Sequence, residues 1–462
     1  MTMERSGVLE YLTHHGILIS PDAVDKIIKY ASSDLIEDII KNKVDYVDEK
    51  FVERALHVNV DKNRDFEVYI PEVKFNSSIE DFRNLFVSKY EKLSKIISAS
   101  ASMRGSTGIR NAKKTQGEVK IIAMVSEVSK TKNGHKRLVV EDTDDRITVL
   151  LLKDKNLADE IILEDEVIGI VGSTSFGSKE TVIFANEIIR PDIPYRILDD
   201  SKKDPVYMAS ISDIHVGSKT FRKNDFESMI RWVKSSDDVA SRLKYFVISG
   251  DIVDGIGVYP GQENDLEILN PLEQYGKLAE FINELPDDIS VFVMPGNHDT
   301  VRLAEPQPIF PEKIKEMFNS NVNFLPNPYN LKIENKNVLV YHGMSLNDMI
   351  ELIPGSSYDS IGKAIEALLI RRHLSPKYGG NTPLIPSKED YHVIETVPDI
   401  FITGHIHSHY IGAYKSVRYV NSSTWQSQTE YQKMMNFSPK PSMLTLFDLN
   451  SRSTIVKKFS DE

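Results

Sequence analysis

The 462-residue sequence contains no cysteine. This absence excludes disulfide bonds, thiolate zinc sites and a thiol nucleophile, and it fits a reducing compartment. No apolar run approaches the roughly 20 residues that a membrane-spanning helix needs. The first residues, MTMERSGVLEYL, lack the basic region and apolar core of a signal peptide. We therefore expect a soluble, cytoplasmic protein that has no membrane partner.

The chain also has fewer positively charged residues than negatively charged ones. The chain has 56 Lys and Arg residues against 68 Asp and Glu, which gives a formal net charge of −12. Proteins that bind nucleic acids on their own usually carry a basic stripe. The acidic balance therefore favours a subunit of a larger assembly, in which a partner makes most of the contacts with duplex DNA.

Five short motifs rich in histidine and aspartate occur in the second half of the chain. They are SDIHVG (Ser212 to Gly217), GDIVDG (Gly250 to Gly255), GNHD (Gly296 to Asp299), YHG (Tyr341 to Gly343) and GHIH (Gly404 to His407). Each follows a mostly apolar run, which predicts a strand buried on both faces. One such motif alone is more typical of a loop or of a capping histidine. Five in order favour one shared site at the strand ends.

This combination of residue types is typical of a two-metal phosphoesterase. Two ions about 3.5–4 Å apart can clamp the attacking and the leaving oxygen of an in-line displacement. Ions that close need a bridging ligand, for which Asp251 is the natural candidate. Imidazole and amide side chains suit Mn, Fe, Zn or Ni as the divalent ions. The motifs therefore predict a metal-dependent hydrolase of phosphate esters with no organic cofactor.

The motif series resembles the calcineurin-like metallophosphoesterase superfamily. Within it, the chain is most similar to the small, exonuclease subunits of archaeal family-D DNA polymerases. The narrower likeness rests on GDIVDGIGVYPGQENDL (Gly250 to Leu266), YHGMSLNDMI (Tyr341 to Ile350) and the segment from Arg371 to His407. It covers roughly residues 115 to 460 and is much less clear over the first hundred residues.

The resemblance implies a 3′–5′ exonuclease that proofreads at single-stranded DNA ends. It also implies a large catalytic polymerase subunit as the partner in a replicative heterodimer, with a sliding clamp as a further candidate partner. The sequence contains no nucleotide-polymerising motif, so DNA synthesis would come from the large subunit. Two alternatives stay open: a scaffold subunit whose nuclease is vestigial, and a stand-alone metallophosphodiesterase that acts on a small molecule.

The resemblance also assigns roles to the motif residues. One metal would be held by Asp213, His215, Asp251 and His407. The other would be held by Asp251, Asn297, His342 and His405. The ions would be Mn in the first place, with Mg, Fe, Zn or Ni as alternatives. His298 would be catalytic without being a ligand, because the histidine of GNHD stabilises charge at the scissile phosphate or protonates the leaving oxygen. The related non-catalytic subunits of eukaryotic polymerases have lost several of these residues, whereas every matched position is present here.

Three further side chains keep two interpretations each. Asp254 would orient a ligand histidine or cap the following turn. Asp299 would orient His298 or cap a helix beginning near Thr300. His409 follows His407 at strand spacing, but a structural role is favoured for it, as for the other histidines outside the motifs.

The chain as a whole is predicted to be of the α/β (α+β) class with several domains. Residues 1–80 are expected to form a small helical domain, with helices over 20–33, 33–43 and 47–57 that serve for packing or for docking another replication protein. Residues 81–116 are expected to hold the end of a helix and a flexible linker, because 96–116 are rich in Ser, Ala and Gly.

The remaining residues are expected to form two further domains. Residues 117–195 predict five short strands, with a hairpin at Asn133-Gly134, and hence an OB-fold barrel. Few aromatic residues occur there, so packing is favoured over binding of single strands. For residues 204–462, the resemblance implies a calcineurin-like sandwich of two sheets flanked by helices. A long insert, Gly355 to Asp390, is predicted to border the DNA channel or the large subunit.

Overall fold

The computed structural model describes residues 5–15, 17–30, 46–47, 66–68, 73, 78–155, 157–176, 181–196, 204–434 and 437–460. The chain divides into two compact units. The first comprises residues 1–68 and 332–335, and the second comprises 69–331 and 336–462. Within the described ranges, no helix combines the length and the apolar character that crossing a membrane requires.

Among the residues that the structure describes, the first unit contains two helices and three two-residue strands. These are α1 (Arg5–His14), β1 (Leu18–Ile19), α2 (Pro21–Tyr30), β2 (Tyr46–Val47) and β3 (Phe66–Glu67). Strand β1 pairs with β2 in parallel, and β3 pairs antiparallel with Lys332 and Ile333. Helix α2 begins after Ser20, whose hydroxyl accepts a hydrogen bond from the Ala23 N–H at 3.3 Å, as expected for an N-cap. The helices predicted over 33–43 and 47–57 lie outside the described residues, apart from Val47 in β2.

The second unit contains a closed five-stranded barrel. Its strands are β4 (Gly117–Lys130), β5 (Lys136–Glu141), β6 (Arg146–Leu151), β7 (Val167–Phe176) and β8 (Thr181–Ile189), in the order β4-β5-β6-β8-β7. Alternate residues of the strands, such as Leu138 and Val140 in β5, are fully buried inside the barrel. The predicted barrel is therefore confirmed, and Gly134 has a φ of +82° in the predicted hairpin.

The segment before the barrel differs from the predicted flexible linker. It holds helix α5 (Ile79–Ser98), a 3-10 turn at Ala101–Met103 and helix α6 (Ile109–Ala112). Ile109 and Ala112 are fully buried in the barrel core, and the Ile109 N–H donates to Asp142 Oδ2 at 2.7 Å. Small polar residues dominate the composition of this segment, but a few well-placed apolar side chains are enough to fix it against the barrel.

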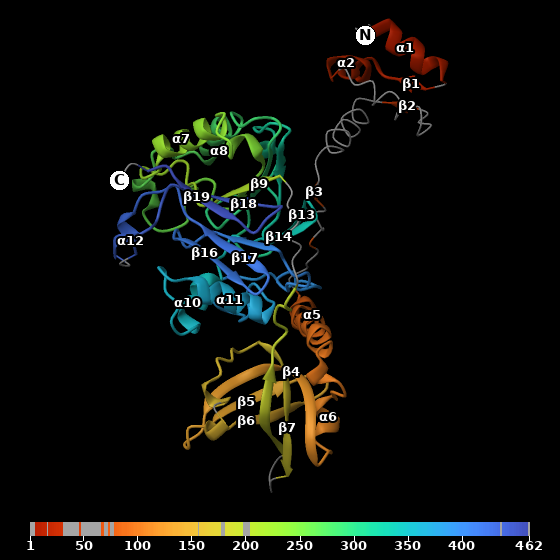
Figure 1. Cartoon of the computed structure of the whole chain (residues 1–462), viewed down its shortest axis with the longest axis vertical. Coiled ribbons are helices and arrows are strands. Elements are labelled where there is room, and N and C mark those ends of the chain that lie inside the picture. Colours follow the sequence, from red (N-terminus) through yellow and green to blue (C-terminus); the bar gives the residue numbers. More distant parts are fainter. Residues whose placement is uncertain are drawn as a thin grey trace. The chain divides into compact units, whose positions relative to one another are not determined.

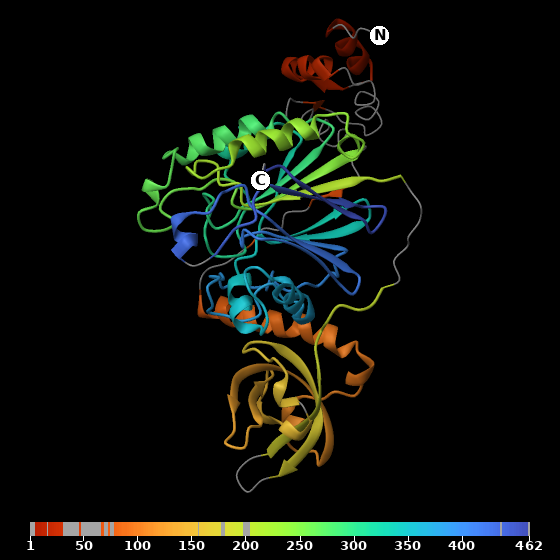
Figure 2. The ribbon, with the colours of Figure 1, turned by 60° about the vertical axis from the view of Figure 1, so that its left-hand side comes forward.

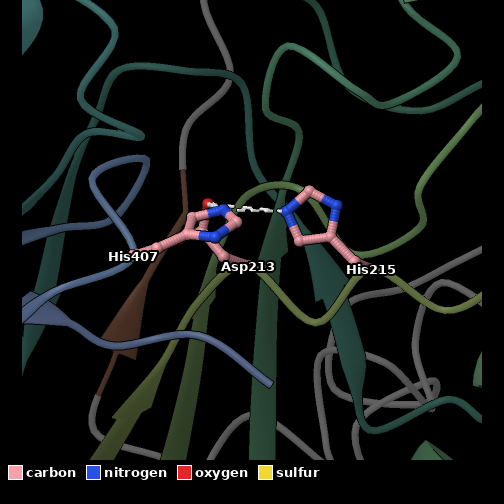
Figure 3. A group of neighbouring side chains, drawn as sticks. All are labelled: Asp213, His215 and His407. Carbon is pink, nitrogen blue, oxygen red and sulfur yellow. Dashed lines mark hydrogen bonds and ion pairs between the residues drawn. The ribbon is translucent and has the colours of Figure 1, made fainter. Parts of the chain in front are cut away.

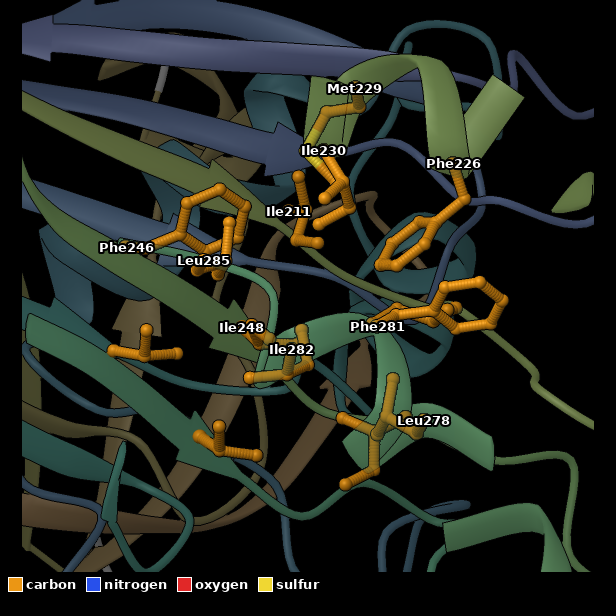
Figure 4. Packing of buried hydrophobic residues seen from close by; sticks show 14 of the residues in the cluster. Ile211, Phe226, Met229, Ile230, Phe246, Ile248, Leu278, Phe281, Ile282 and Leu285 are labelled. Atoms are coloured by element: carbon orange, nitrogen blue, oxygen red, sulfur yellow. The ribbon is translucent and has the colours of Figure 1, made fainter. Parts of the chain in front are cut away.

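The first sheet of the sandwich is mostly parallel. Strands β9 (Tyr207–Ile211), β10 (Leu243–Ser249), β11 (Ser290–Met294) and β12 (Val322–Phe324) run in one direction. Strand β18 (Met443–Asp448) pairs antiparallel with β9, and β19 (Thr454–Lys458) pairs antiparallel with β18 at the edge of the sheet. Helices α7 (Lys223–Val233) and α8 (Pro271–Ile282) cover its outer face. Figure 4 shows Ile211 and Ile248 of the sheet packed against Phe226 of α7 and Leu278 of α8.

The second sheet lies against the first. Its strands follow the order β16 (His409–Tyr414), β17 (Val417–Ser422), β15 (Ile400–Thr403), β14 (Lys336–Val340) and β13 (Tyr329–Ile333). Helices α10 (Leu346–Leu352) and α11 (Gly362–Arg371) cover its outer face (Figures 1 and 2). The short helices α9 (Glu312–Lys315) and α12 (Glu430–Met434) lie in connections. Ser210 and Ser422 share a 2.6 Å hydrogen bond between the sheets. The predicted two-sheet sandwich flanked by helices is confirmed.

The insert at 355–390 packs against the barrel and α5. It contains α11, whose last residue, Arg371, donates from Nε to Glu166 of the barrel at 3.1 Å. Glu166 is buried and also accepts from Arg190 Nε at 2.8 Å. Lys92 of α5 donates to the Asp390 carbonyl at 3.0 Å. These contacts tie the insert to the barrel side of the sandwich, and its role toward DNA or a large subunit stays a prediction.

Candidate metal centre

The motif residues follow strands that end at the same edge of the two sheets. Asp213, Asp251, His342 and His405 each come two residues after their strands, β9, β10, β14 and β15. Five of the predicted metal ligands, Asp213, His215, Asp251, His405 and His407, have φ values between +49° and +68°. Left-handed backbone at residues other than glycine stores strain of roughly 1–3 kcal/mol and clusters at functional sites. The surrounding structure therefore holds these side chains in a fixed arrangement.

Two glycines of the motifs are needed for close approach. A Cβ atom at Gly404 would lie 1.9 Å from Ser212 Oγ, and one at Gly250 would lie 2.3 Å from His342 Nδ1. Gly250 also has a φ of +103°. Any side chain at either position would push the ligand loops apart.

Asp213, His215 and His407 form the first cluster of candidate ligands (Figure 3). Asp213 Oδ1 lies 3.3 Å from His407 Nε2 and 4.0 Å from His215 Nε2, and the two ring nitrogens are 3.0 Å apart. Asp213 Oδ1 is buried without a hydrogen-bond donor. A buried carboxylate oxygen without a partner is costly. A divalent cation among these three side chains would satisfy it, so the residues present fit a metal ion.

Asp251, His342 and His405 form the second cluster, with Asn297 beside it. His342 Nδ1 lies 2.9 Å from the Ser249 carbonyl, to which it donates, and this makes Nε2 the acceptor nitrogen of the neutral ring. That Nε2 lies 3.3 Å from Asp251 Oδ2 and 2.9 Å from Asn297 Oδ1. Three acceptor atoms facing one another in a buried place again fit a cation. Asp251 Oδ2 also lies 3.9 Å from His215 Nε2, so this side chain reaches both clusters.

The electrostatics of the clusters favour added positive charge. Burial lowers the pKa of His342, but the carboxylates of Asp251 and Asp213 outweigh burial and raise the pKa to about 10. Burial, together with the charge on His342, lowers the pKa of the neighbouring His405 to about 3. The second cluster therefore attracts one positive charge strongly, and a bound cation would take the place of the proton on His342.

His298 lies beside the two clusters rather than within them. Its Nδ1 lies 2.9 Å from the Asp254 carbonyl, and its backbone N–H donates to Asp251 Oδ1 at 2.8 Å. Burial lowers the pKa of His298, but the charges of Asp251 and Asp254 outweigh burial and raise the pKa above its usual value. His215, Asp254 and His298 also stand close enough to hold a metal. We favour the other two clusters, because Asp254 Oδ1 already bonds His215 Nδ1 and Gln426 Nε2.

Comparisons with known proteins give the family. The model of the family of B subunits of DNA polymerases alpha and epsilon matches residues 209–412. The DNA polymerase II small subunit of Thermoplasma acidophilum is 72% identical over 457 residues, which cover 99% of this chain and 93% of that protein. The chain belongs to the archaeal DNA polymerase II small subunits. The predicted family resemblance is therefore confirmed.

Two more distant matches add context. The DNA polymerase II small subunit of Archaeoglobus fulgidus is 41% identical over 451 residues, which cover 93% of this chain and 90% of that protein. A solved structure of an archaeal phosphodiesterase is 12% identical to this chain. The match covers 55% of this chain and 99% of that chain, with a TM-score of 0.29. That score is too low to support a structural argument. The residues that match the family model include all eight predicted site residues.

Asp254 and Asp299 take different roles in the small subunit. Asp254 Oδ1 lies 2.7 Å from His215 Nδ1, so it orients a candidate ligand, one of its two predicted roles. Asp299 neither orients His298 nor caps a helix. It accepts from the Gly296 N–H at 2.8 Å and from Tyr275 OH at 3.2 Å, which ties the GNHD turn to helix α8. Burial and the Asp251 charge raise the pKa of Asp299 to about 7.

His409 has a structural place in the small subunit, as favoured from the sequence. It begins β16, and its Nε2 lies 2.9 Å from Thr445 Oγ1 of β18. Burial lowers the pKa of His409 to about 4. Its neutral ring therefore joins the two sheets behind the ligand loops.

Three side-chain amides that the motifs do not predict contact the candidate ligands or their partners. The Asn347 amide lies 2.9 Å from His405 Nε2. With its oxygen turned towards the ring, it would accept from the Nε2 N–H and leave Nδ1 for a metal. Gln432 Nε2 lies 2.9 Å from His407 Nδ1, and Gln426 contacts Asp254. Asn347 lies inside the YHGMSLNDMI stretch, so the sequence offered a signal for its place near the site. Gln426 and Gln432 stand in no motif, and only the fold brings them to the site.

A cavity of about 540 Å³ opens above the clusters. Six predicted site residues line it: His215, Asp251, Asn297, His298, His405 and His407. Asp213 and His342 lie beneath it and are fully buried. Tyr259, Tyr358 and Phe437 contribute to its walls. The arrangement can place a phosphate ester over a metal pair, with His298 at its side.

Proposed function

We propose that this chain carries a two-metal 3′–5′ exonuclease that acts on single-stranded DNA ends beside a large catalytic polymerase subunit. The main support is the buried convergence of metal-binding atoms, above all Asp213 Oδ1, which has no hydrogen-bond donor, and the acceptor atoms around His342 Nε2. When bound, two divalent ions, Mn in the first place, would supply an activated water and neutralise charge at the phosphate. The names of the relatives as small subunits support a large partner subunit.

The two clusters, and the reach of Asp251 Oδ2 towards both of them, support the following ligand assignment. One ion would be held by Asp213, His215, Asp251 and His407. The other would be held by Asp251, Asn297, His342 and His405. Asp254 would hold the His215 imidazole in place by accepting from its second nitrogen. Asn347 and Gln432 would do the same for His405 and His407 with their amide oxygens turned towards the rings.

His298 would act as the general acid. The charges of Asp251 and Asp254 raise the pKa of His298 above its usual value, which favours the protonated ring, and its side chain lines the cavity. A positioned proton donor for the leaving oxygen typically contributes about 10²–10⁴-fold to the rate. The protein would work in the cytoplasm at the replication site, with a sliding clamp as a further candidate partner.

The decisive experiment is digestion of 5′-end-labelled single-stranded DNA by the small subunit together with its large subunit, with and without Mn. We expect a ladder shortened from the 3′ end for the wild type. Asp251→Ala should abolish it, and His298→Ala should slow it about 10²–10⁴-fold. Glu263→Ala, an exposed substitution on the same loop as the GDIVDG motif, is the matched control and should leave the rate unchanged.

Two outcomes would contradict the proposal in different ways. Activity that survives both Asp251→Ala and His298→Ala would show that the site is wrong. No digestion by the wild-type complex would favour a scaffold subunit with a vestigial nuclease. Hydrolysis of small phosphodiesters without digestion of DNA would favour a stand-alone phosphodiesterase.

A further inference from the structure

The cavity above the candidate metal centre is short of cationic side chains. None of the described residues that line it is Lys or Arg. Its upper walls instead carry Val258, Tyr259, Pro260, Tyr358 and Phe437. Sites that recognise phosphate groups by themselves usually present Arg or Lys to the oxygens. Recognition here would therefore combine the metals at the floor with flat apolar contacts at the walls.

Two of the aromatic residues form a pair. The ring centroids of Tyr358 and Phe437 lie 5.3 Å apart, with the rings inclined by 52°. Tyr358 follows α10, and Phe437 follows α12, so the pair joins two segments at the rim of the cavity. Tyr358 is 40% exposed. An aromatic pair that is open to solvent beside a polar centre offers a surface on which a flat ring can stack.

The polar side chains of the same walls are occupied. Asn347 bonds His405, Gln432 bonds His407 and the Thr429 N–H, and Gln426 bonds Ser218 and Asp254. Reading a base requires amide or charged groups aimed at its edge. The amides of this cavity are committed to holding the metal centre, so they are poorly placed to distinguish one base from another.

We infer that Tyr358 and Phe437 form a stacking wall for the base of the terminal nucleotide of a single strand. The inference rests on the proposed nuclease and adds how its substrate is recognised. A cavity of about 540 Å³ is in the usual range for a ligand of nucleotide size. Every base has a flat face, so stacking tolerates all four bases. A paired terminal base must leave its duplex to reach the wall, which makes unpaired ends the better substrates.

A kinetic experiment compares two oligonucleotides that differ only in the 3′-terminal residue, which carries a base in one and is abasic in the other. The full chain is used with its large subunit and Mn. Tyr358→Ala and Phe437→Ala should each raise KM for the base-bearing strand about five- to 150-fold. Both should leave KM for the abasic strand unchanged. Tyr358→Phe should restore the wild-type value.

Tyr195→Ala is the matched control, because Tyr195 is an exposed aromatic residue that does not line the cavity. It should change neither KM. Alanine variants that keep the wild-type preference for the base-bearing strand would overturn the stacking wall while leaving the nuclease intact. Failure of the wild type to cut either strand would instead count against the nuclease, and a binding measurement then decides the wall.

The binding measurement uses a single strand with 2-aminopurine at its 3′ end, with Mn present and in the His298→Ala background, in which cleavage is slow. Stacking on the wall should quench the fluorescence of the bound strand, and Tyr358→Ala combined with Phe437→Ala should abolish the quenching. Fluorescence anisotropy reports the fraction bound. Absence of binding, or binding without quenching, would overturn the inference.

Discussion

Asp254 Oδ1 lies 2.7 Å from Nδ1 of His215. This bond fixes the plane of the imidazole and leaves its Nε2 facing Asp213 and His407. Burial raises the pKa of Asp254, but the bond to His215 and its charge outweigh burial and lower the pKa below the usual value. The pair has the form of a carboxylate that orients a metal-binding histidine.

Asp254→Asn should therefore weaken metal binding. The amide accepts a weaker hydrogen bond than the carboxylate, so His215 becomes less basic and less well oriented. We expect the Mn concentration for half-maximal nuclease activity to rise about 10–100-fold. Titration of Mn at fixed substrate measures it, with Glu263→Gln as the neighbouring control. An unchanged half-maximal concentration would contradict the role of Asp254.

Metal ions should stabilise the fold. A ligand that binds only the native state adds about 2.7 kcal/mol at 100 times its Kd, so Mn should raise Tm relative to EDTA. Asp213→Asn should remove most of this increase, because it neutralises the carboxylate whose buried oxygen lacks a donor. Differential scanning fluorimetry with and without Mn tests this. An equal rise of Tm in the variant would exclude Asp213 as a ligand.

Glu166 should be essential for stability. Its carboxylate is buried and receives Arg190 Nε at 2.8 Å and Arg371 Nε at 3.1 Å. Removing one charge of a buried pair leaves the other uncompensated and typically costs about 3–5 kcal/mol. Glu166→Gln should lower the free energy of unfolding in urea by that order.

Glu164→Gln is a close control for that measurement. Glu164 lies 3.2 Å from Lys377, and its side chain is 45% exposed. An exposed pair contributes about 0–1 kcal/mol because water screens it. Equal effects of the two substitutions would show that the Glu166 network does not hold the barrel against α11.

Lowering the pH from about 6.5 to about 4 should reduce the free energy of unfolding. His373 is buried beside Asp390, with 2.9 Å between His373 Nε2 and Asp390 Oδ2, and burial outweighs the carboxylate and lowers the pKa of His373 to about 4. The unfolded chain takes up this proton below about pH 6.5, whereas the folded chain does not until about pH 4. The free energy of unfolding should therefore decrease as the pH is lowered through this window, by up to about 1.4 kcal/mol per pH unit.

His373→Gln tests this pH dependence and should remove part of the slope in urea denaturation between pH 4 and 6.5. His409, whose pKa is also lowered to about 4 by burial, acts in the same direction and remains in the variant. His409→Gln is thus the second arm of the measurement. A slope that neither substitution changes would assign the acid sensitivity to other groups.

The strand ends could be predicted because their signal is local. Each motif stands directly behind an apolar run, and β9, β10, β11, β14 and β15 end within three residues of the predicted side chains. The barrel could be predicted for the same reason. Alternating apolar and polar residues within each strand and the turn at Gly134 are patterns of a few neighbouring residues. Such patterns predict the structure because the apolar residues that form them are the residues that the folded strand buries.

Long-range partners could not be predicted in this way. Gln432 reaches His407 only because α12 returns beside the ligand loop, and Tyr358 meets Phe437 across two connections. The buried anchors Met103 and Ile109 are single apolar residues in a polar segment. A lone side chain gives no periodic pattern, so its partner becomes known only when the chain is folded.

The turn at Asp213 is fastened by residues made much later in synthesis. Its carbonyl accepts from Thr424 Oγ1 at 2.8 Å and from the Trp425 N–H at 2.9 Å, and β18 pairs with β9, the strand before that turn. During translation, Asp213 emerges from the ribosome before Thr424, Trp425 and β18. The turn that places Asp213 in the ligand cluster cannot be fixed until these later segments have emerged. The candidate ligand cluster can therefore close only after these later segments have been made.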